Sequence, residues 1–299
     1  QIISEYLYYF PNGKQAKIFD RNLNEVSFGD KFKKDFEAIL NFMKPNKLFL
    51  SVSANYSAVK EAELVFLFFK EDLIFYPLPL EVSNWLEYSI ERFTKEPELK
   101  KIFIDFMKSV DTPIQSIDTK FEKTQMSPEF IPDNIPDEFK PFFAQAKEVT
   151  RSEANINYGL FSVNLNEESK GIQKLFEVFG PIIDIILKDK VLIWDEMETS
   201  LHPRIVKEIL RLIMYGKRDS KAQLIFSTHD TNLLDLNTFR RDQIWFTELN
   251  KDRETDIYSL AELKNVRKDE NISKGYMNGK YGAIPFIHNP LIFPVEEGC

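Results

Sequence analysis

Residues 191–196 read Val-Leu-Ile-Trp-Asp-Glu, an apolar run that ends in two acids. Further along the chain, residues 224–230 read Leu-Ile-Phe-Ser-Thr-His-Asp, a second apolar run that ends in polar residues. Pro203 stands between the two runs where a helix can begin, and apolar residues then recur at helical spacing up to Ile213. This strand, helix and second strand predict a parallel pair joined by a right-handed crossover.

The polar residues that end the two strands are candidates for chemistry. We expect Asp195, Glu196 and His229 at the carboxyl edge of the sheet, where open α/β sheets bind ligands. In a P-loop nucleotidase, the first acid would hold Mg²⁺, the second would orient or deprotonate the attacking water, and the histidine would report on the γ-phosphate. A solvated Asp-Glu pair is the plain alternative. The strand context disfavours it, because carboxylates that end an apolar strand are paired, metal-bound or exposed at a cleft.

Bulk composition limits the class of protein. A chain of 299 residues with 43% hydrophobic content can bury one large core or two modest ones. Its longest apolar stretches, 64–69 and 182–187, are too short to cross a membrane. The single cysteine, Cys299, excludes an intrachain disulfide and argues against a structural zinc site. We therefore expect a cytoplasmic protein in a reducing compartment.

Charge gives little support for nucleic-acid binding. The formal net charge of −8 provides no overall attraction to DNA, so binding would require a local basic patch. One stripe of the helix after Pro203 carries Arg204, Lys207, Arg211 and Arg218. A solvated face is the favoured explanation of this stripe, and contact with DNA or an acidic protein is the alternative.

The sequence before residue 151 predicts two structural parts, which comprise residues 1–56 and residues 57–150. The first part is a β-ribbon and helix, with strands at 3–10, 16–21 and 25–28, a turn at 11–13 and an amphipathic helix at 31–43. The second part is a helical and irregular insertion, with helices at 57–69, 81–93 and 98–110 and an irregular proline-rich arm at 111–141.

Residues 151–299 predict a carboxyl-terminal lobe. Its expected elements are a strand at 158–165, a helix at 168–187 kinked by Pro181, the strand–helix–strand unit described above, and closing strands at 243–248 and 256–260.

Residues 191–203, Val-Leu-Ile-Trp-Asp-Glu-Met-Glu-Thr-Ser-Leu-His-Pro, resemble the Walker B strand and D-loop of ABC-type ATPases of the SMC, RecF and OLD-like group, often described as AAA family ATPases. Thr228-His229-Asp230 resembles their switch histidine. The resemblance implies that Asp195 binds Mg²⁺, Glu196 is the catalytic base and His229 senses the γ-phosphate. It also implies that the D-loop, with Ser200 and His202, lies near the nucleotide.

Glu168-Ser169-Lys170-Gly171 opens the helix before this strand, where the family carries its signature motif. A small hydroxyl and a glycine at a helix start expose free N–H groups and the positive end of the dipole to an anion. By resemblance, Ser169 and Gly171 would touch a nucleotide held mainly by another subunit, which implies a head-to-tail homodimer sandwiching ATP. A serine N-cap explains the same four residues equally well.

No Gly-x-x-x-x-Gly-Lys-Ser/Thr loop occurs in the sequence, and none of its Gly-Lys pairs has the required spacing or hydroxyl. We expect this Walker A loop to come from a segment before residue 1. Residues 6–21 and 45–51 resemble segments of bacterial, RloA-like defence members, some encoded beside TOPRIM-like partners. Residues 264–287 resemble a family-specific segment near the nucleotide or a partner, although a polar tail docked on the core is the favoured alternative.

The sequence therefore predicts an α/β fold, a P-loop NTPase of the ABC-type ATPase head class with a mixed or parallel sheet. The predicted function is Mg²⁺-dependent ATP hydrolysis in an anti-phage defence module, where nucleotide state gates a nuclease or toxin partner. A RecF-like or SMC-like repair ATPase and a nucleotide-gated scaffold without turnover are the alternatives. A Ser227-His229-Asp230 hydrolase triad is disfavoured because adjacent residues at a strand end point in different directions.

Overall fold

The computed structural model describes residues 2–57, 59–76, 85–125, 148–264, 266–267 and 270–285. The chain divides into two compact units, each assembled from separate stretches of sequence. Unit 1 comprises Gln1–Val82, Ile183–Trp194 and Lys217–Ile225, and unit 2 comprises Ser83–Ile182, Asp195–Gly216 and Phe226–Cys299.

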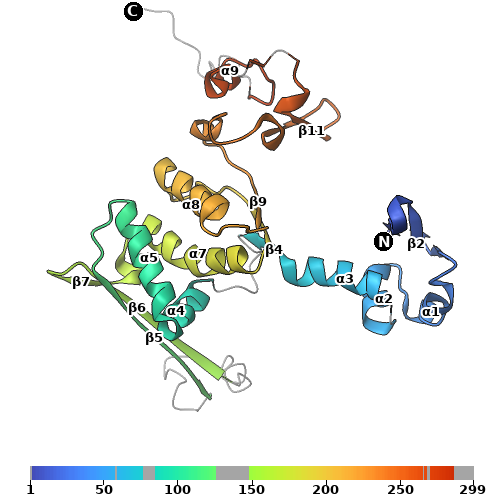
Figure 1. Ribbon diagram of the computed structural model, residues 1–299, viewed down its shortest axis with the longest axis horizontal. Helices are drawn as coiled ribbons and strands as arrows, with labels where there is room; N and C mark the ends of the chain where they lie inside the picture. Colours follow the sequence, from blue (N-terminus) through green and yellow to red (C-terminus); the bar gives the residue numbers. More distant parts are fainter. Residues whose placement is uncertain are drawn as a thin grey trace, which may run out of the picture. The chain divides into compact units, whose positions relative to one another are not determined.

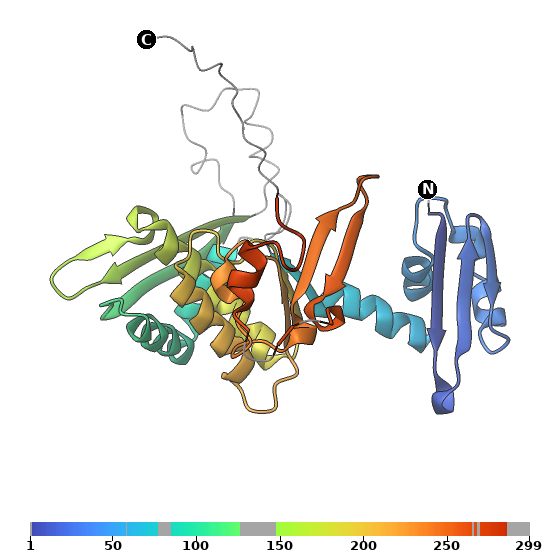
Figure 2. The same cartoon turned by 90° about the horizontal axis from the view of Figure 1, so that it is seen from above.

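Unit 1 begins with the expected β-ribbon. Strands β1 (Ser4–Tyr9), β2 (Ala16–Asn22) and β3 (Glu25–Phe28) pair antiparallel in that order, and Figure 2 shows them side by side. The β1–β2 connection is a 3-10 turn at Pro11–Gly13, where Asn12 and Gly13 take positive φ values of 56° and 77°. The sequence prediction of this hairpin is confirmed.

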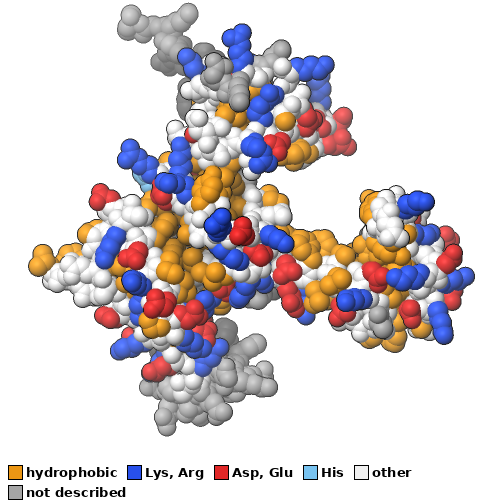
Figure 3. Space-filling model, in the orientation of Figure 1, with side chains coloured by type: hydrophobic (Ala, Val, Ile, Leu, Met, Phe, Trp, Pro, Cys, Tyr) orange, Lys and Arg blue, Asp and Glu red, His pale blue; other side chains and the backbone are white. Residues whose placement is uncertain are grey.

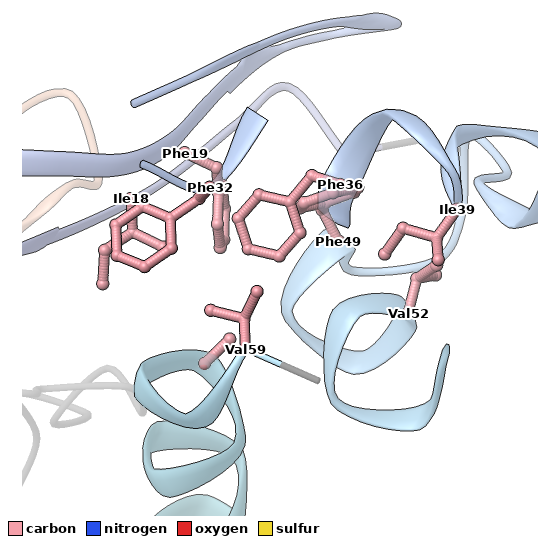
Figure 4. Packing of buried hydrophobic residues seen from close by; sticks show 9 residues of the cluster. Ile18, Phe19, Phe32, Phe36, Ile39, Phe49, Val52 and Val59 are labelled. Carbon is pink, nitrogen blue, oxygen red and sulfur yellow. The ribbon is translucent and has the colours of Figure 1, made fainter. Parts of the chain in front are cut away.

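Short helices cover the ribbon. They are α1 (Lys33–Glu37), α2 (Phe49–Tyr56) and α3 (Lys60–Leu67), with a 3-10 turn at Leu40–Phe42. Side chains from strands and helices converge in one buried cluster (Figure 4), whose members are Ile18, Phe19, Phe32, Phe36, Ile39, Phe49, Val52, Val59 and Ala62. Edge-to-face pairs of phenylalanine rings fill its centre, with Phe19 and Phe49 centroids 4.9 Å apart.

Two helix predictions in this region are wrong in extent. The segment 31–43 is not one helix, because it tightens after Glu37 into the 3-10 turn, where the Ile39 N–H donates to Phe36 O at 3.1 Å. This tightening lets Phe36 and Ile39 enter the same cluster. The helix expected at 57–69 begins at Lys60 and continues into a π-helical turn, Phe68–Asp72.

The parallel sheet that positions the site has the strand order β4 (Leu73–Tyr76), β8 (Val191–Trp194) and β9 (Gln223–Phe226). Strands β4 and β8 pair parallel, with Leu73 opposite Val191. The Gln223 N–H donates to Lys190 O at 3.0 Å, so β8 and β9 also start side by side and run the same way. The strand–helix–strand prediction is confirmed, whereas β4 lies in a segment predicted as helical or irregular.

Unit 2 contains a long antiparallel hairpin that the sequence analysis did not predict. Strands β5 (Ser116–Gln125), β6 (Glu148–Asn157) and β7 (Ser162–Asn164) pair in that order. The irregular arm predicted at 111–141 is therefore wrong over 116–125, and the rest of that arm from residue 126 lies outside the described residues. The strand predicted at 158–165 is wrong in position, because a turn at residues 158–161 separates β6 from β7.

Helices pack along this hairpin. Helices α4 (Trp85–Lys95) and α5 (Pro97–Ser109) contact β5, as Figure 1 shows. They also meet α7 (Lys170–Leu187), which continues through Pro181. Rings of Phe93, Phe103, Phe176 and Phe179 form the contact, with Phe93 and Phe176 centroids 4.9 Å apart. Gly180 permits the close approach, since a Cβ there would lie 2.8 Å from Ser89 Oγ.

The remaining elements of unit 2 are α8 (Pro203–Tyr215), β10 (Trp245–Leu249), β11 (Thr255–Ser259) and α9 (Ile272–Met277), with 3-10 turns at Leu165–Glu167, Thr231–Leu233, Arg241–Gln243 and Leu260–Glu262. Helix α8 and the closing hairpin match the prediction. A separate cluster with buried Phe246, Leu260, Ile272 and Tyr281 anchors the carboxyl-terminal segment. Residues 270–285 thus dock on a core, while 286–299 lie outside the described residues.

No helix in the described part of the chain has the length and apolar character needed to cross a membrane.

Candidate functional site

The segments that follow β8 and β9 are bonded to each other. The Ser227 hydroxyl donates to Asp195 Oδ1 and accepts the Glu196 N–H at 2.8 Å. One residue further, the Met197 N–H donates to the Ser227 carbonyl at 3.2 Å. These contacts place the ends of β8 and β9 at the same edge of the sheet, as parallel strands require.

Glu196 stands in a left-handed backbone conformation with φ of 47°. This conformation turns the chain sharply after the strand, and the Thr199 N–H closes the turn by donating to the Glu196 carbonyl at 3.0 Å. The Thr199 hydroxyl also donates to Glu196 Oε2 at 3.3 Å. A non-glycine residue in this region is strained, and such strain concentrates at functional sites.

His229 lies beside this carboxylate. Its Nε2 is 3.9 Å from Glu196 Oε1, and its backbone N–H donates to Glu198 Oε1 at 2.6 Å. The structure therefore brings together three residues that the sequence predicted to meet, Asp195, Glu196 and His229. It does so through two residues, Ser227 and Glu198, that the sequence analysis did not assign to the site.

The site is open to solvent. The side chains of Glu196 and His229 are 58% and 88% exposed, so the cavity that a reaction would need is not closed by the described residues of this chain. Water screens charges at such a surface, and a second molecular surface would be needed to exclude it.

The start of α7 lies against the segment after Glu198. A Cβ built on Gly171 would come within 3.1 Å of the Ser200 carbonyl, so glycine permits this approach. The Ser169 hydroxyl accepts the Ile172 N–H at 3.3 Å, which is the geometry of an N-cap. Ser169 is therefore the N-cap of α7, as the alternative interpretation of these residues predicted. The exposed start of the helix also lies next to Ser200.

The loop before α7 is fixed by side chains on either side. Gln173 donates to the carbonyls of Asn166 and Glu168 at 3.0 and 2.8 Å. The Tyr158 hydroxyl donates to Glu168 Oε1 at 2.6 Å. Burial, together with this bond to a carboxylate, raises the pKa of the Tyr158 phenol far above its usual value. The hydroxyl therefore stays protonated and holds the loop at all ordinary pH values.

His202 begins α8 as its N-cap. Its Nδ1 accepts the Arg204 N–H at 3.2 Å, and Pro203 takes the first helical position. Ser200 has a positive φ of 66° and is exposed. Both predicted nucleotide contacts are therefore on the turn between Glu196 and α8, and His202 also has this structural role.

The oxygen donors at the site fit Mg²⁺ held jointly with a phosphate. Asp195 and Ser227 offer one carboxylate and one hydroxyl, and Mg²⁺ commonly uses one or two protein oxygens and takes its remaining ligands from phosphates and waters. Within the described ranges, no group of three or more His, Cys, Asp or Glu side chains is placed to hold a metal alone. A metal here would therefore need further ligands from a phosphate group or from water.

Of the two unassigned residues, Ser227 could have been found from sequence by pairing the two strand ends, whereas Glu198 could not. Ser227 is the first residue after β9, as Asp195 is after β8, so parallel register sets them side by side. Glu198 has no such signal, because its contact with His229 depends on the turn that the positive φ of Glu196 creates.

A parallel sheet within a mixed α/β fold, with acids at the end of its central strand, fits the P-loop NTPase-like α/β fold of AAA and ABC-like ATPases. A family model described as "AAA domain, putative AbiEii toxin, Type IV TA system" matches residues 86–235, half of the chain. The chain belongs to this family. None of the curated proteins compared with the chain matches it.

Proposed function

We propose that the protein is an ATP-binding and ATP-hydrolysing subunit of a bacterial defence module, of the RloA-like kind, in which nucleotide state gates a nuclease or toxin partner. The observation that carries the proposal is the bonded pair of strand ends, which sets Asp195, Glu196 and His229 at one sheet edge. The toxin–antitoxin description of the family supports the defence setting.

Each residue would have a separate task. Asp195, oriented by the Ser227 hydroxyl, would hold Mg²⁺ with the phosphates of ATP. The metal, when bound, supplies positive charge that stabilises the transferring phosphoryl group. Glu196 would orient or deprotonate the attacking water, and His229, 3.9 Å away, would contact the γ-phosphate.

The proposal needs a phosphate-binding loop of the Gly-x-x-x-x-Gly-Lys-Ser/Thr kind, which this sequence does not contain, and a second subunit. The exposed Glu196 and His229 support the second requirement, since a partner surface would exclude water. The start of α7, with Ser169 and Gly171, would face the nucleotide of the neighbouring subunit in a head-to-tail homodimer. Its free N–H groups and helix dipole suit a phosphate.

The test is a Glu196→Gln substitution in the full-length protein that carries this sequence. The amide keeps the shape of the side chain but cannot accept the proton from water, so ATP hydrolysis should fall at least about a hundredfold. ATP binding should persist, and the homodimer should become more stable, as measured by light scattering with Mg²⁺ and ATP. Hydrolysis at the unmodified rate would contradict the proposal.

A nucleotide-gated scaffold without rapid turnover is the second candidate, and the solvent exposure of Glu196 favours it. A carboxylate that is open to bulk water contacts many exchanging waters and does not by itself hold one of them in line for attack. Release of a bound partner protein on addition of ATP, with hydrolysis much slower than release, would select the scaffold over the hydrolase.

A further inference from the structure

We infer that Glu198 is a positioning residue that sets His229 for catalysis by binding its backbone N–H. The inference rests on the proposed ATPase function. Glu198 Oε1 accepts the His229 N–H at 2.6 Å, a short bond between a carboxylate and a main-chain donor. His229 is otherwise free to move, since its side chain is 88% exposed.

Beyond the bond from the Ser227 hydroxyl to Asp195 Oδ1, this bond is the last of three that join the two segments in the described part of the chain. The Glu196 N–H meets the Ser227 hydroxyl, the Met197 N–H meets the Ser227 carbonyl, and the Glu198 carboxylate meets the His229 N–H. The series extends the contact between the strands beyond the regular sheet. Its final bond fixes the residue whose imidazole lies 3.9 Å from Glu196.

The second oxygen of Glu198 argues that the residue is not there for stability. Oε2 is buried and has no hydrogen-bond partner among the described residues. A buried acceptor without a partner is unfavourable, and a smaller or neutral side chain would avoid this cost. Because Glu198 carries this energetic cost, its presence is better explained by the bond from its other oxygen, Oε1, to the His229 N–H.

Glu198 also connects this bond to the turn that leads to α8. Its carbonyl accepts the Leu201 N–H at 2.9 Å, and the next turn residue, Ser200, lies against Gly171. A shift of this turn would therefore move the carboxylate that holds His229. A displacement at the start of α7 would thus be transmitted through this turn and the Glu198 carboxylate to His229.

The test compares Glu198→Ala and Glu198→Gln with Glu208→Ala, a control carboxylate that pairs with Arg211 on the surface of α8 at 3.1 Å. In the full-length protein, Glu198→Ala should lower kcat for ATP about tenfold or more while leaving KM within about twofold, because the lost bond acts in the transition state. Glu198→Gln keeps an acceptor for His229 and should recover most of kcat. Glu208→Ala should match the unmodified protein.

A double-mutant cycle distinguishes positioning from a structural role. In a His229→Ala background, Glu198→Ala should change kcat by less than about twofold, because the imidazole it positions is already gone. The melting temperature of the Glu198→Ala single variant should stay close to that of the unmodified protein. An equally large loss in both backgrounds, or an increase in KM instead of a fall in kcat, would overturn the inference.

Glu196→Gln in the same assays separates the two hypotheses. If Glu196→Gln hydrolyses ATP at the normal rate, the proposed function itself fails. If Glu196→Gln is inactive and Glu198→Ala is fully active, the proposed function stands and the role of Glu198 is refuted.

Discussion

Several side chains in this protein act by holding a nearby backbone in place, and Glu270 shows how charge contributes to that task. Its carboxylate accepts hydrogen bonds from Lys280, from the Arg267 N–H at 3.1 Å and from the Tyr281 hydroxyl at 2.9 Å. Lys280 is the main cause, followed by the two other donors, of a fall in the pKa of Glu270 from 4.5 to about 2. The bonds from Lys280 and Tyr281 attach the turn that follows α9 to the residue just before the N-cap of that helix.

The lowered pKa predicts how acid acts on this part of the chain. A carboxyl group whose pKa falls on folding stabilises the fold above its unfolded pKa, near 4.5, and that contribution disappears as pH falls towards 2. The melting temperature of the unmodified protein should therefore exceed that of Glu270→Gln by a constant margin at neutral pH. The margin should shrink between pH 4.5 and 2.

Thermal unfolding followed by circular dichroism across this pH range measures the margin, and carbon NMR of the Glu270 carboxyl measures its pKa directly. Glu254, on the exposed turn between β10 and β11, provides a matched Glu→Gln control. An NMR titration midpoint near 4.5 would contradict the prediction.

At the scale of elements, helix α2 depends on a distant strand for its cap. Its N-cap position, Leu48, has no side chain that can accept a hydrogen bond. Glu5 of β1 caps the helix instead, because its carboxylate accepts hydrogen bonds from the N–H groups of Phe49 and Leu50 at 2.7 and 2.8 Å. Arg21, fully buried in β2, lies 3.6 Å from the same carboxylate and donates to Lys47 O at 2.6 Å. Ribbon and helix are thus joined by one charged pair.

Loss of this cap should destabilise unit 1. Glu5→Ala removes two charge-assisted bonds and leaves the buried Arg21 guanidinium without its carboxylate, so unfolding free energy should fall by about 3 kcal/mol. Glu37→Ala is the control, because Glu37 pairs with Lys33 at 3.9 Å with both side chains exposed. It should change stability by less than about 0.5 kcal/mol.

Urea denaturation of the two variants, monitored through fluorescence and circular dichroism, gives both values. Similar losses for Glu5→Ala and Glu37→Ala would show that the cap is unimportant.

The elements that sequence predicted well are those whose evidence is local. The β8, α8 and β9 order follows from apolar runs, Pro203 and helical spacing within one stretch. Strand β4 was missed because its partner β8 lies more than a hundred residues away, and its four residues have no pattern that separates strand from helix. Strand β5 was missed because the prolines from Pro128 onward dominated the composition of its neighbourhood.

The same distinction applies to the site. Asp195, Glu196 and His229 follow predicted strands directly, so parallel pairing alone could bring them together. Glu198 needs the unusual backbone of Glu196, which a sequence pattern does not reveal.

At the scale of the whole molecule, acidic residues outnumber basic ones, with 47 Asp and Glu against 39 Lys and Arg. The net charge is −8, and on the face in Figure 3 acidic and basic side chains are interspersed. Within the basic stripe of α8, Arg211 is engaged with Glu208 at 3.1 Å, and Lys207 interacts with the carboxylate of Asp235. These contacts support the solvated-face explanation of the stripe.

We therefore expect no measurable affinity for duplex DNA of arbitrary sequence at about 0.15 M salt, because the net charge is −8 and both Arg211 and Lys207 already interact with carboxylates. Replacing Arg204, Lys207 and Arg211 by glutamine should leave fluorescence anisotropy of a labelled duplex unchanged. Binding that weakens in this variant, with a smaller salt dependence, would show that α8 contacts DNA.

The left-handed backbone of Glu196 has a consequence for the history of the protein. A side chain there costs about 1–2 kcal/mol that glycine would not incur, so stability and the catalytic role proposed for Glu196 favour different residues at one position. In a lineage that no longer needed hydrolysis, drift would be expected to replace this glutamate with glycine or asparagine before it disturbed the buried Leu192 or Trp194 nearby. Under the proposed function, a glutamate at residue 196 would mark the descendants that still hydrolyse ATP.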